Sequence, residues 1–73
     1  MEVLIQSNGK DGTWIGVSGL REALATCSDY IRSCKIPCES WSGGIIRKNE
    51  IEVGTVTHDG RIFDPNGHQI ILR

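Results

Sequence analysis

Residues 51–73 read IEVGTVTHDGRIFDPNGHQIILR, and this stretch decides the fold class. Asp59-Gly60 offers two residues that tolerate positive φ, which a two-residue hairpin turn requires. Asp64-Pro65-Asn66-Gly67 places Asp first and Pro second in a type I turn, with Gly where a left-handed residue closes the loop. Val, Thr and Ile fill the segments between these turns, as is typical of strands. The last third of the chain therefore predicts a three-strand antiparallel meander.

The segment before this meander predicts one more strand. Residues 45–48 are apolar and then basic, and Asn49-Glu50 follows as a tight turn, so the predicted meander region covers about residues 45–73. Residues 51–57 alternate in a way that predicts a half-buried strand. The side chains expected on its buried side are Ile51, Val53 and Thr55.

Residues 19–34 predict the one helix of the chain. Apolar side chains recur there at spacings of three and one, which is one face of a 3.6-residue period. This face comprises Leu20, Ala23, Leu24, Cys27, Tyr30, Ile31 and Cys34. Ser18 is the expected N-cap, because its hydroxyl can accept a hydrogen bond from an early helical N–H. Pro37 ends the helix, and Ile36 before it is biased towards an extended conformation.

The N-terminal segment predicts a hairpin. Residues 3–6 and 13–17 are rich in apolar and β-branched side chains, and the turn cluster Ser7-Asn8-Gly9 and a further loop at Lys10-Asp11-Gly12 separate them. The resulting order is ββαββββ over a single α+β domain of residues 1–73. An antiparallel sheet of about five to six strands would carry the helix on one face, because the apolar stripe must be buried against an apolar sheet face.

The expected core joins the helix to that face of the sheet. Its helical members are Leu20, Leu24, Cys27 and Ile31. Its sheet members are Val3 or Leu4, Ile15, Val53, Val56, Ile62 and Ile70, and Trp14 and Phe63 are also assigned to the core.

Two runs break this one-sided pattern. Val3-Leu4-Ile5 and Ile70-Ile71-Leu72 are each apolar at three consecutive positions, and neighbours along a strand point to opposite faces. Each run therefore places an apolar side chain on the face away from the helix. One interpretation is a central strand with a partly exposed far face. The other is a face covered by a partner or a second copy, with Leu4 and Ile71 as self-association residues.

Composition argues against several classes of protein. The chain has 73 residues, a net charge of -1 and basic residues interleaved with acids, whereas nucleic-acid binders usually have a basic excess. No apolar run approaches the length of a membrane span, and the N-terminus lacks the pattern of a secretory signal. We expect a cytoplasmic protein with no membrane partner. Its three cysteines, an odd number, are then expected to be free thiols.

Residues that could carry chemistry do not form a recognisable site. Only Cys34 and Cys38 have a spacing compatible with zinc, and His58 and His68 bracket the last hairpin. Cys38 follows the helix, where the negative end of the dipole disfavours a thiolate. The alternative of a small metal-binding protein or cysteine enzyme is kept open, to be tested by measuring bound zinc. We expect no enzyme activity, no metal and no cofactor.

Trp41 lies in a Ser/Gly loop shortly before Arg47 and Lys48. A large apolar side chain in such a loop either packs onto the core or contacts a partner, and Trp and Arg are enriched at interface hot spots. Trp41, Arg47 and Lys48 are therefore the predicted partner-binding residues. The same group could serve a weak single-stranded nucleic-acid binder, which a salt titration with oligonucleotides would distinguish.

The function expected from the sequence is a small, non-enzymatic protein-interaction module that associates with itself. It would bind another protein or a second copy through the helix-free face or through an edge strand, which leaves no sequence motif. In general style only, the compact chain resembles the small products of phages and other mobile elements, without any residue-level motif.

Overall fold

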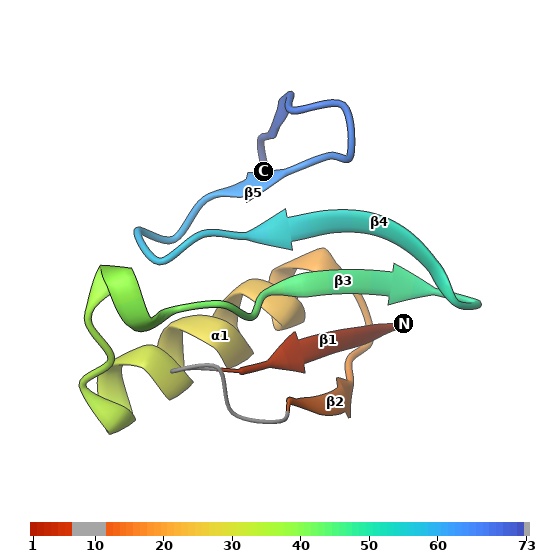
Figure 1. Cartoon of the computed structure of the whole chain (residues 1–73). Coiled ribbons are helices and arrows are strands. Elements are labelled where there is room, and N and C mark those ends of the chain that lie inside the picture. The colour runs from red at the N-terminus through yellow and green to blue at the C-terminus, as the bar shows by residue number, and fades with distance from the viewer. Residues whose placement is uncertain (7–11, 73) are drawn as a thin grey trace.

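The computed structural model describes residues 1–6 and 12–72 and confirms the α+β fold class (Figure 1). In chain order the elements are β1 (Glu2–Ile5), β2 (Thr13–Gly16), α1 (Leu20–Cys34), the 3-10 turn η1 (Cys38–Ser40), β3 (Ile45–Lys48), β4 (Ile51–Val56), β5 (Ile62–Phe63) and β6 (Gln69–Ile70). The turn expected at Ser7-Asn8-Gly9 and the loop residues Lys10 and Asp11 lie outside the described residues.

The six strands form one antiparallel sheet in the order β2-β1-β3-β4-β5-β6. Consecutive strands are neighbours except where α1 separates β2 from β3, so the chain crosses behind the sheet and returns beside β1. Strands β2 and β6 are the two edges, and the hairpin of β5 and β6 lies at the end of the sheet away from β2 (Figure 1). The expected tight turn at Asn49 and Glu50 is present, with positive φ at both residues.

Helix α1 begins one residue later than expected and is not capped by the Ser18 hydroxyl. Gly19 is the N-cap and makes no side-chain hydrogen bond. Instead, the backbone N–H and the hydroxyl of Ser18 both donate to the carboxylate of Glu22, at 2.8 and 2.5 Å. These bonds, the hydroxyl first, lower the pKa of Glu22. In the described part of the chain, no helix is long and apolar enough to cross a membrane.

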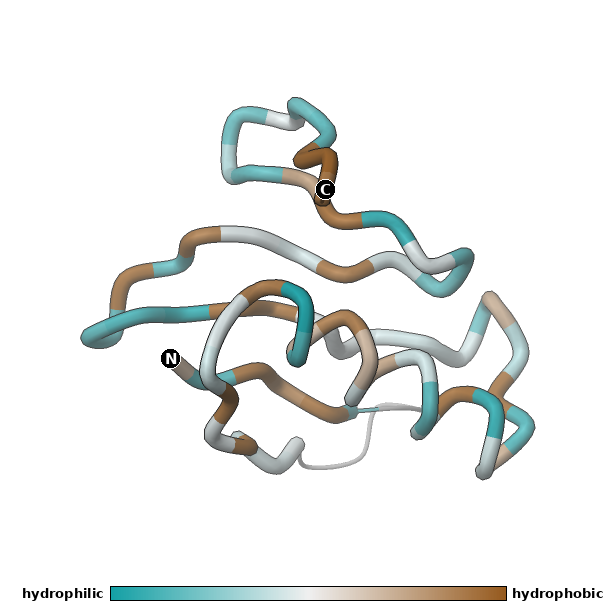
Figure 2. Tube along the Cα trace, turned by 180° about the vertical axis from the view of Figure 1, so that it is seen from behind, coloured by the Kyte–Doolittle hydropathy of each residue, from teal (hydrophilic) through white to brown (hydrophobic). Residues whose placement is uncertain are grey.

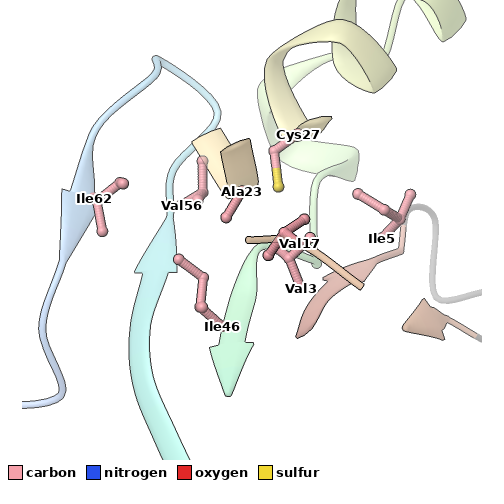
Figure 3. Packing of buried hydrophobic residues seen from close by; sticks show 8 residues of the cluster. All are labelled: Val3, Ile5, Val17, Ala23, Cys27, Ile46, Val56 and Ile62. Atoms are coloured by element: carbon pink, nitrogen blue, oxygen red, sulfur yellow. The ribbon is translucent and has the colours of Figure 1, made fainter. Parts of the chain in front are cut away.

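The helix lies across one face of the sheet, in front of the strands when the molecule is seen from behind (Figure 2). Side chains from both layers meet in one buried cluster (Figure 3). Its members are Val3, Ile5, Val17, Ala23, Cys27, Ile46, Val56 and Ile62. This cluster defines the helix-covered face, and strand residues adjacent to its members point to the other face, here called the helix-free face.

The expected core was only partly correct. Val3 rather than Leu4 is buried, and Trp14 and Phe63 do not pack against the cluster. Ile15 lies on the edge strand β2 and is 38% exposed, because no further strand covers it. Cys34 is exposed, since it is the last residue of the helix. Sequence periodicity predicts which side of a helix or strand is apolar. It does not predict how much of that side the helix or sheet packed against it covers.

Strand β4 also differs from the expected alternation. Its buried residues are Gly54 and Val56, whereas Ile51 is 68% exposed. The register shifts beside this point, because Ile46 pairs with Gly54 but the next residue, Arg47, pairs with Glu52. One extra residue in β4 forms a β-bulge there, and a bulge interrupts the strict two-residue alternation.

Candidate functional site

The helix-free face carries a row of large apolar side chains. Leu4 lies between the buried residues Val3 and Ile5, and Trp14 is its directly paired neighbour on β2. The row continues through three further strands, where Thr55 of β4 is paired with Ile45 of β3 on one side and with Phe63 of β5 on the other. Because directly paired residues share a face, these side chains lie on the side opposite to α1.

None of the four apolar side chains of this row packs against the buried cluster. Leu4, Trp14, Ile45 and Phe63 are each half-buried, and the apolar residues that do pack against the cluster are others. Their partial burial therefore comes from neighbours on the same face. In the described part of the chain, no second layer covers this row.

An arginine is fixed beside this row. The guanidinium of Arg47 lies over the ring of Trp14, 3.7 Å from the ring centroid, and its Nε donates to Oε1 of Glu2 at 2.9 Å. Arg47 and Glu2 are directly paired across β3 and β1. Stacking of this kind contributes about 0.5–1 kcal/mol at an exposed site. Both charges are thus held in defined positions at the margin of the apolar row.

Trp41, one of the three predicted partner-binding residues, lies with the helix. Its ring contacts Tyr30 at a centroid distance of 6.2 Å, and its Nε1–H donates to the carbonyl oxygen of Val56 at 3.1 Å. It packs against the buried cluster, whereas Arg47 lies on the helix-free face and exposed Lys48 ends β3. The structure therefore does not bring Trp41 and Arg47 together, and Trp14 is the aromatic neighbour of Arg47 instead. Their role in partner binding stays a prediction.

The two predicted self-association residues are also apart. Leu4 belongs to the helix-free face, while Ile71 follows β6 and is 63% exposed. Strands β3, β4 and β5 separate β1 from β6 in the sheet. Ile71 lines a hollow of about 220 Å³ together with Leu24 of the helix and Ile70 and Leu72 of the C-terminal segment.

Sequence reasoning did not identify Trp14 and Phe63 as members of this face. The available signal was the pairing of the first two strands, which places Trp14 opposite Leu4. A long loop does not determine hairpin register, whereas a two-residue turn does. The expected two-residue turn at Asp59-Gly60 was wrong and gave the wrong face for Phe63, because it would pair Phe63 with the buried Val56. In the structure the turn encloses three residues between Thr57 and Arg61, and Phe63 pairs with Thr55 instead.

Polar residues near the β4–β5 turn have structural partners. The Thr57 hydroxyl donates a hydrogen bond to the carboxylate of Asp59, and this bond is the main cause of the lowered pKa of Asp59. Arg61 also forms an ion pair with Asp59 at 3.3 Å. Nε2 of His58 lies 2.6 Å from the carbonyl oxygen of Ile36, which ties this turn to the segment after the helix. These contacts indicate that His58 and Asp59 stabilise the turn.

The cysteines differ sharply in environment. Cys27 is buried in the core, whereas Cys34 and Cys38 are exposed, and all three thiols are free. Burial raises the pKa of the Cys27 thiol from 9.0 to about 11, so this group remains protonated at neutral pH. Among residues 1–6 and 12–72, no three His, Cys, Asp or Glu side chains are grouped so that they could hold a metal ion.

We expect two thiols of the native protein to react rapidly with Ellman's reagent near pH 8, and the third to react only after unfolding, because Cys27 is buried and protonated. Cys34→Ser should remove one rapidly reacting equivalent. Because folding raises the Cys27 pKa above its value of 9.0, stability should decrease as the pH rises from 9.0 towards about 11. Three rapidly reacting thiols in the native chain would contradict this assignment.

The chain matches no protein-family model, and no curated protein or solved structure matches it. The assignment of a function therefore depends on the surfaces of this chain.

Proposed function

We propose that this chain is a small non-enzymatic interaction module that associates with itself through its helix-free face. The observation that carries the proposal is the row of Leu4, Trp14, Ile45 and Phe63, which runs across the sheet without contact to the buried cluster. Monomeric proteins rarely expose large contiguous apolar patches, and such patches usually mark contact surfaces. A chain of this size gains little stability from a single core, so covering a second apolar face is favourable.

A second copy is the occupant that fits this face best. Glu2 and Arg47 place both charge signs at the margin of the apolar row. Two copies related by a two-fold axis present the same patch to each other, so a surface that carries both signs can match charges across the axis. The net charge of -1 opposes association only weakly.

The alternative of a single-stranded nucleic-acid binder receives less support from the same residues. An arginine stacked on a tryptophan is a known element of such surfaces. However, Arg47 is hydrogen-bonded to Glu2, and Arg47 is also directly paired with Glu52 of β4. Two carboxylates beside the guanidinium repel phosphate, so the Trp14–Arg47 pair suits a protein surface better than a phosphate backbone.

Substitution Ile45→Lys should disrupt self-association, because it places a charge in the centre of the apolar row. The aliphatic stem of the new lysine still covers the sheet, so the fold is retained. The matched control is Ile51→Lys. Ile51 pairs with Lys48, the strand neighbour of Arg47, and therefore lies on the opposite face, where it is 68% exposed. Sedimentation equilibrium should show an increase of about tenfold or more in the dissociation constant for Ile45→Lys.

The control variant should associate like the wild type. Equal association of both variants and the wild type would refute the helix-free face as the contact surface. Circular dichroism of both variants establishes that each one is folded, so a loss of association in Ile45→Lys is attributable to the face.

A further inference from the structure

Strand β2 is the longer of the two sheet edges. It has four residues, whereas β6 at the opposite edge has two. Within the described residues each edge strand has a neighbour on one side only, so its outward peptide groups have no sheet partner there. Thr13, Ile15 and Gly16 of β2 are exposed.

The hydrogen-bond pattern identifies which peptide groups of β2 point outward. The Val17 N–H donates to the carbonyl oxygen of Met1 at 2.9 Å, so odd-numbered residues of this segment face β1. The pattern on the other side of β1 agrees, because the carbonyl oxygens of Leu4 and Gln6 accept bonds from the Gly44 and Ser42 N–H groups. Peptide groups alternate in direction along an antiparallel strand. The N–H and C=O groups of Trp14 and Gly16 therefore point away from the sheet.

This edge lacks the features that usually protect edge strands. Natural proteins place charges, prolines or bulges on an exposed edge to prevent pairing with another strand. Residues 12–20 read GTWIGVSGL and contain neither a charged residue nor a proline. The pairing of β1 with β2 runs without a register shift.

We infer that two copies of this chain join edge to edge through β2, in antiparallel orientation about a two-fold axis. Trp14 then pairs with Gly16 of the second copy, and Ile15 lies opposite Ile15 of the second copy. In this register each outward N–H and C=O of Trp14 and Gly16 gains a partner. The side chains fit as well, because a Cβ at Gly16 would meet nothing within 4 Å, which leaves room for the indole of the second copy.

The register also covers the apolar side chain that β2 exposes. Ile15 is 38% exposed on the helix-covered side. The two Ile15 residues would occupy the closely spaced, non-hydrogen-bonded position, where facing side chains are nearest. Pairing extends the sheet within its own plane and leaves the helix-free face open. The inference rests on the proposed function in that the chain self-associates. The two contacts share the indole of Trp14, but the edge contact is made mainly by the peptide groups of Trp14 and Gly16.

The test compares Gly16→Pro with Gly16→Ala. Proline removes the outward N–H of residue 16, which has no sheet partner among residues 1–6 and 12–72, whereas the bonds to β1 are made by the odd-numbered residues. Alanine retains this N–H and meets no atom within 4 Å. We expect Gly16→Pro to raise the dissociation constant measured by sedimentation equilibrium by about tenfold or more, and Gly16→Ala to leave it unchanged.

A measurement on the wild type makes the test independent of any variant. Amide hydrogen exchange of Trp14 and Gly16 should slow as the protein concentration rises through the association range, whereas the Ile15 amide, which faces β1, is protected throughout. Trp14 and Gly16 amides that exchange freely in the associated protein overturn the edge contact.

The outcomes separate the edge contact from the face contact. Loss of association in Gly16→Pro but not in Ile45→Lys supports the edge and refutes the face. Loss of association in Ile45→Lys but not in Gly16→Pro supports the face and refutes the edge, provided that the Trp14 and Gly16 amides are also unprotected. A chain that remains monomeric at all concentrations overturns both.

Discussion

Replacing Gly44 by alanine is expected to prevent folding or to lower the free energy of unfolding by more than about 4 kcal/mol. Gly44 has φ +91, and a Cβ there would lie 2.2 Å from the carbonyl oxygen of Val56. The neighbouring backbone cannot move away, because Gly44 donates to Leu4 O at 2.7 Å and accepts from Val56 N at 2.8 Å. The added methyl group would therefore break the contact between the β3 entry and β4.

The control for this prediction is Gly67→Ala. Gly67 has φ +88, nearly the same backbone conformation, but a Cβ there meets nothing within 4 Å. Its substitution should cost about 1–2 kcal/mol, the cost of a left-handed conformation alone. Urea unfolding followed by circular dichroism gives both values at one fixed protein concentration, since self-association would itself add stability. Equal destabilisation by the two substitutions would show that the close approach at Gly44 is unimportant.

The second large effect is expected for Ile46→Ala in the centre of the sheet. Ile46 is fully buried in β3, among residues from β1, β4 and the helix (Figure 3). Removing its outer carbon atoms loses transfer free energy and leaves a cavity, which together cost about 2–5 kcal/mol. The same urea experiment measures this loss as a lower transition midpoint.

Ile51→Ala is the matched control for Ile46→Ala. Ile51 is 68% exposed, so the substitution should change the free energy of unfolding by less than about 0.5 kcal/mol. Similar losses for the two substitutions would mean that the buried cluster does not dominate stability. Native proteins are stable by only about 5–15 kcal/mol, so Ile46→Ala alone is expected to remove a large share of the total.

The proposed contacts divide the sheet into three functional parts. The helix-covered face supplies the core, and the helix-free face presents Leu4, Trp14, Ile45 and Phe63. The β2 edge presents peptide groups that have no sheet partner in the described part of the chain. Each part follows from the same geometry, because one helix can cover only one face of a sheet and an open sheet always has two edges. The two contact surfaces can be tested separately, since Ile45 and Gly16 lie on different strands.

Much of the fold was readable from local sequence. The turns at Asn49-Glu50 and Asp64–Gly67 separate strands at the positions where the structure has them, and the helix was predicted to within one residue of its start. A turn also forms at Asp59-Gly60, but it encloses three residues instead of two. Turn chemistry and helical periodicity act over a few residues, so one sequence suffices to recognise them. The same local signals left open whether Val3 or Leu4 faces the helix, and the structure places Val3 in the core.

Only the tertiary structure decided which residues meet across the sheet. The placement of Trp14 opposite Leu4, the stacking of Arg47 on Trp14 and the packing of Trp41 against Tyr30 all join segments distant in sequence. The bulge beside Arg47 likewise decides the face of Ile51, which pairs with Lys48 on the helix-covered side and is exposed there. Local patterns determine which elements form, whereas strand register and the extent of each layer depend on contacts between elements, because those contacts are made only when the whole chain has folded.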